Sequence, residues 1–355
     1  MQSRSDKGPR FGDFLEQLAG KTIAIVYSYS NVVDHESTWY DRWRSDVICY
    51  FGAAVEALGA EPRYIDVDTY LRLMSEPNTF IGHAIINLHS GLNEIGSWPI
   101  ISSLASWRGV PIVPCSSDVH IVGERKDIAN ALARTTRMNV PADWVAGTED
   151  KKKYILKPRD LGMSKGIVVT TDRSLIEDQL SKSTYIAQEF IRGFDATAAM
   201  VLLPDHSYVV LGAMIYLPES ESIHDWILET QAKDERNTSC RYIRKRIEVE
   251  RSLANEMIAL AERLGRSSVF RIDFRVNPDD QGNAPRSLTL PEAHFLEANP
   301  TPTISESSSF GELMSAAMSE PALAEKLTQG ALVRLPPRVR AQATLVALQL
   351  FAAQA

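Results

Sequence analysis

Four polar side chains in the last third of the chain have a spacing that suits metal binding. Arg271 and Asp273 lie in the run VFRIDFRVN, and Glu297 and Asn299 lie in FLEANPTPT, which prolines then end. Side chains two apart on a strand share a face. If the two strands are neighbours, Asp273, Glu297 and Asn299 converge as the hard oxygen ligands that Mg²⁺ prefers, with Arg271 beside them. The alternative is a surface salt bridge between Arg271 and Asp273, with Glu297 at a turn.

A lysine followed by a glycine-containing loop forms a second motif. Lys157 ends the strand-like segment KKYILKP, and a loop with Gly162 and Gly166 leads into the segment KGIVVTT. Glycine lets a backbone approach a phosphate closely, and lysine neutralises the phosphate charge. The chain has neither the GxxxxGK[ST] motif of the P-loop nor the GxGxxG motif of dinucleotide-binding proteins. An ordinary β-hairpin has the same pattern, so both interpretations stay open.

The segment YIAQEFIRGFD carries a third set of polar residues. Gln188 and Glu189 stand between apolar residues, and Asp195 follows them. A strand that leaves the core at this point could offer its backbone N–H and C=O groups to the edge of an adenine ring. The alternative is a strand and turn without a ligand.

Strand-like and helix-like segments alternate over the first third of the chain, which contains none of these three motifs. Buried apolar runs predict strands and amphipathic runs predict helices. The expected strands are 21–28, 62–68, 83–90 and 110–116, and the expected helices are 45–60 and 98–109. This alternation indicates a parallel sheet with helices on both faces. Residues 1–118 are therefore expected to form one α/β domain.

After residue 118 the pattern becomes a mixture of short strands and helices, which contains all three motifs. The expected strands are 152–158, 165–171, 184–191, 196–203, 207–217, 269–277 and 293–300, and the expected helices are 126–138, 250–265 and 338–354. The strands 196–203 and 207–217 are expected to be antiparallel. The polar stretch 218–241 has weak periodicity, and both a functional lid and plain disorder stay open for it.

The composition excludes several classes of protein. The net charge of -7 disfavours sequence-independent binding of nucleic acid, and the basic clusters 151–153 and 244–246 carry no assigned function. The cysteines are three, far apart and without a CxxC pair, which fits a reducing cytoplasm. The polar N-terminus lacks the apolar core of a signal peptide, and no apolar run reaches the ~18 residues of a membrane span. A cytoplasmic protein without nucleic-acid or membrane partners is expected.

In order and type, these motifs resemble the ATP-grasp enzymes, and within them the D-alanine–D-alanine ligase branch. The resemblance runs from about residue 21 to residue 312. The segment NLHSGLNEIGS, with His89 and Glu94, is similar to the LHGxxGEDG segment of the branch, and ANPTPTISESSSF is similar to its xNTxPGMTxxSL segment. The motifs follow in the order of a helix opened by Lys126, Lys157 with its glycine loop, the strand with Gln188 and Asp195, Arg-x-Asp and Glu-x-Asn.

The resemblance implies an ATP-grasp fold of the α/β plus α+β class. In this fold a Rossmann-like parallel-sheet domain precedes two α+β subdomains that clasp ATP. The implied division is 1–118 for the N-terminal domain, 119–192 for the central subdomain, 193–320 for the C-terminal subdomain with the metal site, and 321–355 for a C-terminal helical extension. Relatives in this branch are often dimers through the first domain, so a homodimer is expected by analogy.

The resemblance also implies a role for individual residues. The ATP contacts would be Lys126, Lys157, Gly162, Ser164, Gly166, Gln188, Glu189, Phe190, Ile191, Asp195 and Leu296. Asp273, Glu297 and Asn299 would hold two Mg²⁺ ions, which Mn²⁺ could replace. Arg271 would stabilise an oxyanion, and Lys233 would reach the γ-phosphate from a lid formed by 218–241. The substrates would be held by Glu36, His89, Ser308 and Ser309.

The implied reaction joins a small carboxylate substrate to a small amine substrate. The carboxylate attacks the γ-phosphate of ATP and gives an acyl phosphate and ADP. The amine then attacks the acyl carbon, phosphate leaves, and an amide remains. Water must be kept out, because it would hydrolyse the acyl phosphate.

Several positions depart from the branch and point to substrates other than two D-alanines. The Ser-Ser-Val run of its glycine loop is Met163-Ser164-Lys165 here, and the tyrosine after its lid lysine is Asp234. In the branch these groups share one hydrogen-bond network around the first amino acid, and here both ends are lost. The aromatic loop 28–43 could line a larger pocket or pack against the next helix. A divergent D-alanine–D-alanine ligase, a non-catalytic ATP-binding protein and a kinase are the alternatives.

Overall fold

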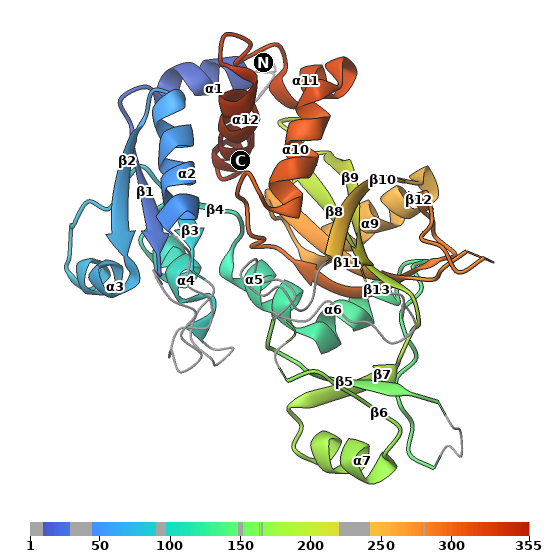
Figure 1. Ribbon diagram of the computed structural model, residues 1–355. Coiled ribbons are helices and arrows are strands. Elements are labelled where there is room, and N and C mark those ends of the chain that lie inside the picture. Colours follow the sequence, from blue (N-terminus) through green and yellow to red (C-terminus); the bar gives the residue numbers. More distant parts are fainter. Residues whose placement is uncertain are drawn as a thin grey trace, which may run out of the picture.

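The computed structural model in Figure 1 describes residues 10–28, 45–89, 97–147, 152–162, 164, 166–219, 242–279 and 281–354. Its first layer is a four-stranded, fully parallel sheet with the order β2-β1-β3-β4. The strands are β1 (Thr22–Tyr27), β2 (Glu61–Asp66), β3 (Ala84–Leu88) and β4 (Ile112–Val113). The helices beside it are α1 (Phe11–Leu18), α2 (Ser45–Ala57), α3 (Val67–Ser75) and α4 (Ile100–Trp107). The predicted α/β architecture of this part is confirmed.

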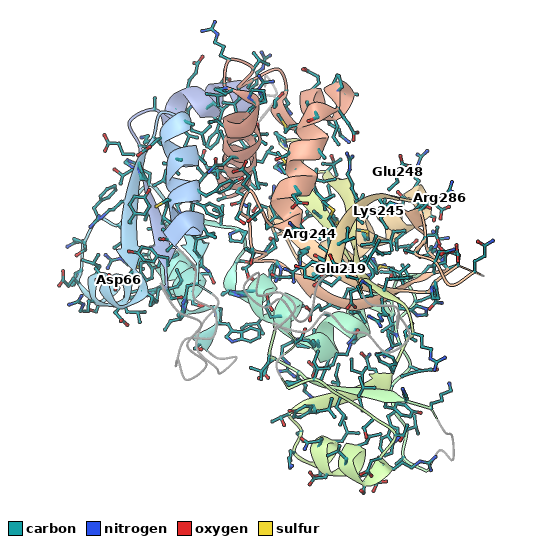
Figure 2. The ribbon with its side chains drawn as sticks, in the orientation of Figure 1. Asp66, Glu219, Arg244, Lys245, Glu248 and Arg286 are labelled. Carbon is teal, nitrogen blue, oxygen red and sulfur yellow. The ribbon has the colours of Figure 1, made fainter. Side chains whose placement is uncertain are left out.

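Helix α3 was not expected, and it shortens the second predicted strand. That strand was placed at 62–68, but it ends at Asp66, which is labelled in Figure 2. The Asp66 carboxylate accepts a hydrogen bond of 3.0 Å from the Thr69 backbone N–H and so caps α3. A side-chain cap of this kind starts a helix directly after a strand. The strand order also reverses between β1 and β3, so the carboxyl ends of these strands form the switch point where ligands bind in such sheets.

The second layer is a six-stranded sheet with the order β12-β10-β9-β8-β11-β13. Its strands are β8 (Phe194–Leu202), β9 (Tyr208–Pro218), β10 (Tyr242–Val249), β11 (Val269–Val276), β12 (Ser287–Leu288) and β13 (Ala293–Asn299). All neighbours are antiparallel except β10 and β12. One face packs on a core that includes α5 (Ser117–Glu124), α6 (Lys126–Ala133) and α9 (Arg251–Leu264).

Helix α6 begins at Lys126 as predicted and ends earlier than predicted. The expected range was 126–138, but the helix stops at Ala133. The hydroxyls of Thr135 and Thr136 donate to the backbone carbonyls of Leu132 and Ala133 at 2.7 and 2.6 Å. Threonine side chains compete in this way with the backbone bonds of a helix, which explains the turn at this point.

A three-stranded sheet with the order β6-β5-β7 forms a separate lobe, the lowest part of the molecule in Figure 1. Its elements are β5 (Tyr154–Pro158), β6 (Val168–Thr170), α7 (Arg173–Ser181) and β7 (Tyr185–Glu189). Tyr154, Leu156, Ile176 and Ala187 form its small core. Because this core uses one face of the sheet, the other face, with Lys157 and Gln188, is left for the rest of the molecule.

Three helices close the chain, α10 (Ser309–Ser319), α11 (Pro321–Thr328) and α12 (Pro337–Ala352). Figure 1 shows α12 between α2 of the first domain and α10, and residues 341–350 are all buried there. The core around α12 includes residues of α1, α2, β1, β8 and β9, so this helix joins the first domain to the six-stranded sheet. Within the described residues, no helix combines the length and the apolarity needed to cross a membrane.

Candidate active site

The predicted metal-binding residues lie opposite one another on two paired strands. β11 and β13 are antiparallel neighbours, with Arg271 opposite Asn299 and Asp273 opposite Glu297. Residues directly opposite in an antiparallel pair have their side chains on the same face. The expectation that these strands pair and that the four side chains converge is confirmed.

A β-bulge in β13 places Leu296 on that same face. Asp273 pairs with Glu297, but the next residue, Phe274, pairs with Phe295, so Leu296 is the extra residue. Phe295 and Ala298 are both buried, although they are three residues apart. The two residues between them therefore share the open side of the strand. A regular strand would have turned Leu296 into the core, away from the ATP contacts that the resemblance implies.

Asp273 is held by two partners on this face. The Arg271 guanidinium forms an ion pair of 2.9 Å with Asp273 Oδ2, and the Thr197 hydroxyl of β8 donates to Asp273 Oδ1 at 2.6 Å. Burial raises the pKa of the Asp273 carboxyl, and the charge of Arg271 opposes that rise. Burial works against the charged form of Arg271, yet Asp273 beside it raises the pKa of Arg271. Arg271 therefore keeps its positive charge throughout the physiological range.

Two buried lysines approach Glu297 from other elements. Lys126 Nζ, in the first turn of α6, lies 3.2 Å from Glu297 Oε2 and donates to the Leu161 carbonyl at 2.6 Å. Lys157, on β5, is only 4% exposed. Burial lowers the pKa of Lys157 to about 8, Glu297 opposes this change, and Lys126 adds to it. Lys126 thus pairs with Glu297, and Lys157 lies close enough for the charge of Glu297 to affect its pKa. Two cations at this position suit phosphate groups.

The predicted glycine loop connects β5 to β6 beside these lysines. Leu161, at the start of the loop, supplies the carbonyl that binds Lys126, and Gly162 follows it. Ser164 and Gly166 have positive φ angles of 58° and 69°. A Cβ atom at Gly166 would lie 3.0 Å from Pro158 and 3.1 Å from the Tyr185 hydroxyl. The backbone conformation and the lack of space therefore both favour glycine at this position.

The residues expected around adenine follow along β7 and the segment after it. Gln188 is fully buried, and its Nε2 donates to Pro141 O at 3.4 Å and to Asp143 Oδ1 at 3.3 Å. Its Oε1 has no hydrogen-bond partner among the described residues. Since both contacts of Nε2 are acceptors, the amide orientation is fixed, and Oε1 remains as a buried acceptor. Glu189 pairs with Lys152 at 3.0 Å.

Arg275 contacts several residues of this segment, and it is not among the predicted site residues. Its Nε donates to the Ile191 carbonyl at 3.0 Å, its Nη1 lies 3.0 Å from Asp195 Oδ1, and its guanidinium stacks 5.5 Å from the Phe190 ring centroid. Arg275 is buried on β11. A signal was present, because Arg271, Asp273 and Arg275 have the same spacing of two and therefore share one face.

The predicted substrate-binding residues have different surroundings. His89, at the end of β3, is buried and hydrogen-bonds through Nδ1 to the Ser28 hydroxyl at 3.0 Å. Burial lowers the pKa of His89 to about 3, and nearby His120 adds to that decrease. Ser309 contacts the Tyr216 hydroxyl at 2.7 Å, and Ser308 caps α10 by accepting from the Gly311 N–H at 3.1 Å.

Ser309 is linked through Tyr216 to the face that carries Asp273. Burial raises the pKa of Tyr216, and the negative charge of Asp273 contributes to the rise. Arg244, labelled in Figure 2, holds the segment before Ser309 from β10. Its Nη1 donates to the Ser307 carbonyl at 2.6 Å, and its Nη2 lies 2.6 Å from Glu312 Oε1. Glu36, Lys233 and Glu94 lie outside the described residues, as do 29–44 and 220–241.

The donor set of this face fits Mg²⁺ bound together with phosphate. Among the described residues, no three His, Cys, Asp or Glu side chains form a metal-binding cluster. The face instead offers two carboxylates, Asp273 and Glu297, and the amide oxygen of Asn299, which accepts from the Thr301 N–H at 2.8 Å. Mg²⁺ is commonly held by one or two carboxylates while substrate phosphates supply the remaining oxygen ligands.

Comparisons with known proteins identify the fold. Neither the protein-family models nor the curated proteins gave a match to the sequence. Among solved structures, the VanG D-Ala:D-Ser ligase from Enterococcus faecalis aligns over 93% of this chain and 99% of its own, with a TM-score of 0.61 and 16% identity. The D-alanine–D-alanine ligase from Bacillus anthracis complexed with ATP aligns over 84% and 92%, with a TM-score of 0.56 and 14% identity.

A third structure gives the same result. The D-alanyl-alanine synthetase A from Vibrio cholerae aligns over 84% of this chain and 94% of its own, with a TM-score of 0.58 and 11% identity. At identities this low, the structural alignments show a shared fold and do not show a shared activity. The chain therefore has the ATP-grasp fold of the D-alanine–D-alanine ligases and of a D-Ala:D-Ser ligase, as the motifs predicted.

Proposed function

We propose that this protein is an ATP-dependent carboxylate–amine ligase that joins two small amino-acid-like substrates. The reaction would proceed through an acyl phosphate and release ADP and phosphate. One observation supports this most directly: Arg271 and Asp273 lie opposite Asn299 and Glu297, with the buried Lys126 at Glu297. This arrangement combines acids for a metal, cations for phosphates and an arginine, in a fold that the aligned ligases share.

The charges of the site are arranged to receive a metal–triphosphate group. Asp273, Glu297 and Asn299 would hold two Mg²⁺ ions, or Mn²⁺ in their place, and the ions would neutralise charge that develops on the phosphate oxygens. Lys126 and Lys157 would bind the phosphates under the Gly162–Gly166 loop. In the structure Lys126 is paired with Glu297, so phosphate binding would free Glu297 for the metal.

The remaining residues would act on the base, the ribose and the acyl group. Gln188 to Ile191 would line the adenine, with Phe190 and Leu296 on its faces, and Asp195 would bind the ribose hydroxyls. Arg271 stays charged because of Asp273, so it can stabilise the oxyanion formed when the amine attacks the acyl carbon. Lys233 would contact the γ-phosphate, and Glu36, His89, Ser308 and Ser309 would contact the substrates.

The substrates would differ from two D-alanines. The glycine loop and the residue after Lys233 lack the serine and tyrosine of the branch. Ser308 uses its hydroxyl to cap α10, and Ser309 replaces the leucine of the branch and contacts Tyr216. A divergent D-alanine–D-alanine ligase is the alternative, followed by a kinase and by a non-catalytic ATP-binding protein.

The test is phosphate release from Mg·ATP with a panel of single and paired D- and L-amino acids, combined with mass spectrometry of the products. A signal that needs two substrates and yields a new amide mass would support the ligase. Turnover with D-alanine alone would favour the alternative ligase, and a phosphorylated product without an amide would indicate a kinase. ATP binding without any turnover would indicate a non-catalytic protein.

A further inference from the structure

His120 is a fully buried side chain whose two ring nitrogens make no hydrogen bond to any described residue. It lies on α5 with 0% exposure, and its ring centroid is 6.3 Å from that of Trp98. Neither Nδ1 nor Nε2 has a hydrogen-bond partner within the part of the chain that the structure describes. Buried polar atoms nearly always have a hydrogen-bond partner in native proteins, so two unpaired nitrogens on one ring need an explanation.

Helix α5 brings His120 close to two segments that carry predicted site residues. One side of the ring is near His89, because His120 contributes to the lowered pKa of His89. Gly123, one turn further along α5, faces Pro300, which a Cβ at Gly123 would approach to 2.7 Å. Glu124 of the same helix accepts from the Thr301 hydroxyl at 3.4 Å. His120 thus lies between the end of β3 and the residues that follow Asn299.

The protonation state of the ring limits the chemical groups that could bind to it. Burial lowers the pKa of His120 to about 4, so the ring is neutral at pH 7. A neutral imidazole offers one donor and one acceptor. The two nitrogens point away from each other, so one hydroxyl or carboxamide pairs with one of them, and it can do so as donor or as acceptor in either tautomer. An aliphatic side chain would leave both nitrogens unpaired. A carboxylate could only accept from the ring N–H, and it would bring a charge to a fully buried position.

We propose that His120 is a specificity-determining residue that contacts a hydroxyl or carboxamide side chain of an amino-acid substrate. This inference rests on the proposed ligase function, because it names the class of one of its substrates. It predicts that serine, asparagine or glutamine, in the D or L form, is preferred over alanine, leucine or methionine of similar size. Loss of this hydrogen bond would reduce kcat/KM by roughly tenfold.

Binding is tested first, because it does not depend on turnover. The protein contains seven histidines. The measurement is NMR of protein that carries an isotope label in the histidine rings. The NMR signals of the His120 ring are assigned by their loss in His120→Leu. Addition of serine, asparagine and glutamine, with and without Mg·ATP, should shift these signals, and alanine, leucine and methionine should not. If no amino acid moves the His120 signals, because a bound water already satisfies the ring, the proposal is wrong.

Kinetics then separate this proposal from the ligase function. In the wild type, kcat/KM should favour a polar substrate over its apolar counterpart, and His120→Leu should remove or invert that preference. Val119→Ala is the matched control, because Val119 lies on the same helix but faces Gly265; its preference should equal that of the wild type. A preference unchanged in His120→Leu would overturn the inference while the ligase stands. Shifted His120 signals without any amide product would overturn the ligase and keep the binding site.

Discussion

Replacing Lys157 by methionine should make the protein more stable and at the same time weaken its hold on ATP. Lys157 is 4% exposed, and burial lowers its pKa from 10.5 to about 8. At pH 7 the lysine is still charged, so the folded protein carries the cost of a buried ammonium group. A change of this size in pKa corresponds to roughly 3 kcal/mol. Methionine has a similar length and no charge, so Lys157→Met should stabilise the nucleotide-free protein by roughly 1 to 3 kcal/mol.

The pH dependence of the free energy of unfolding checks the sign of this effect independently. The pKa of Lys157 is lower in the folded state than in the unfolded chain. Between pH 8 and 10.5 the unfolded chain therefore binds a proton that the folded protein has released, and stability rises with pH by about 1.4 kcal/mol per unit. Below pH 8 both states keep the proton and the cost is fully present. Lys157→Met should lack this rise and be the more stable protein at pH 7.

Urea unfolding followed by circular dichroism, at several pH values from 7 to 10, measures both quantities without nucleotide. Calorimetric titration with Mg·ATP should show a loss of affinity of roughly 10- to 100-fold, the worth of a hydrogen bond to a charged group. Lys152→Met is the control, because the Lys152 side chain is 53% exposed and pairs with Glu189 on the surface. It should change stability by less than about 0.5 kcal/mol. Equal stability and equal pH slopes for wild type and Lys157→Met would refute the reasoning.

Three further predictions concern the face that carries Asp273 and Glu297 and the helix α10. Glu297→Gln removes a carboxylate from that face, so ATP-dependent phosphate release should fall by roughly 100-fold, with a higher Mg²⁺ requirement in a metal titration. Thr197→Val removes the donor 2.6 Å from Asp273, and we expect Mg²⁺ affinity to fall by roughly 10- to 100-fold while thermal unfolding changes little. Ser308→Ala removes the acceptor of the Gly311 N–H and should cost about 1 kcal/mol of stability, measured by urea unfolding; an unchanged midpoint would mean that the cap contributes nothing.

The side-chain faces of β11 and β13 could be predicted from the sequence because the period of a strand is two. Arg271 and Asp273, like Glu297 and Asn299, share a face in any regular strand, and the pairing of β11 with β13 places Asp273 opposite Glu297. The bulge at Leu296 could not be predicted. No glycine or proline marks it within AHFLEAN, and it follows from how Phe295 and Ala298 both reach the core.

Other residues were missed because their roles depend on distant partners. Arg275 acts on Ile191 and Asp195, which are about eighty positions earlier in the chain, and only the tertiary pairing of β11 with β8 brings them together. The short helix α5 was not predicted, and no motif in the sequence points to His120. The sequence order of motifs, in contrast, was enough to predict the fold that the aligned ligases share.

The cationic side chains of the site differ in their ion-pair partners. This difference indicates whose surroundings ATP binding would change most. Arg271 is paired with Asp273 on the same strand, and Arg275 with Asp195 on the neighbouring strand of the same sheet. Lys126 is paired with Glu297 across two elements, α6 and β13. Lys157 is buried on the small lobe and has a lowered pKa, so it gains most from an incoming phosphate. ATP binding should therefore change the surroundings of Lys157 more than those of the two arginine pairs.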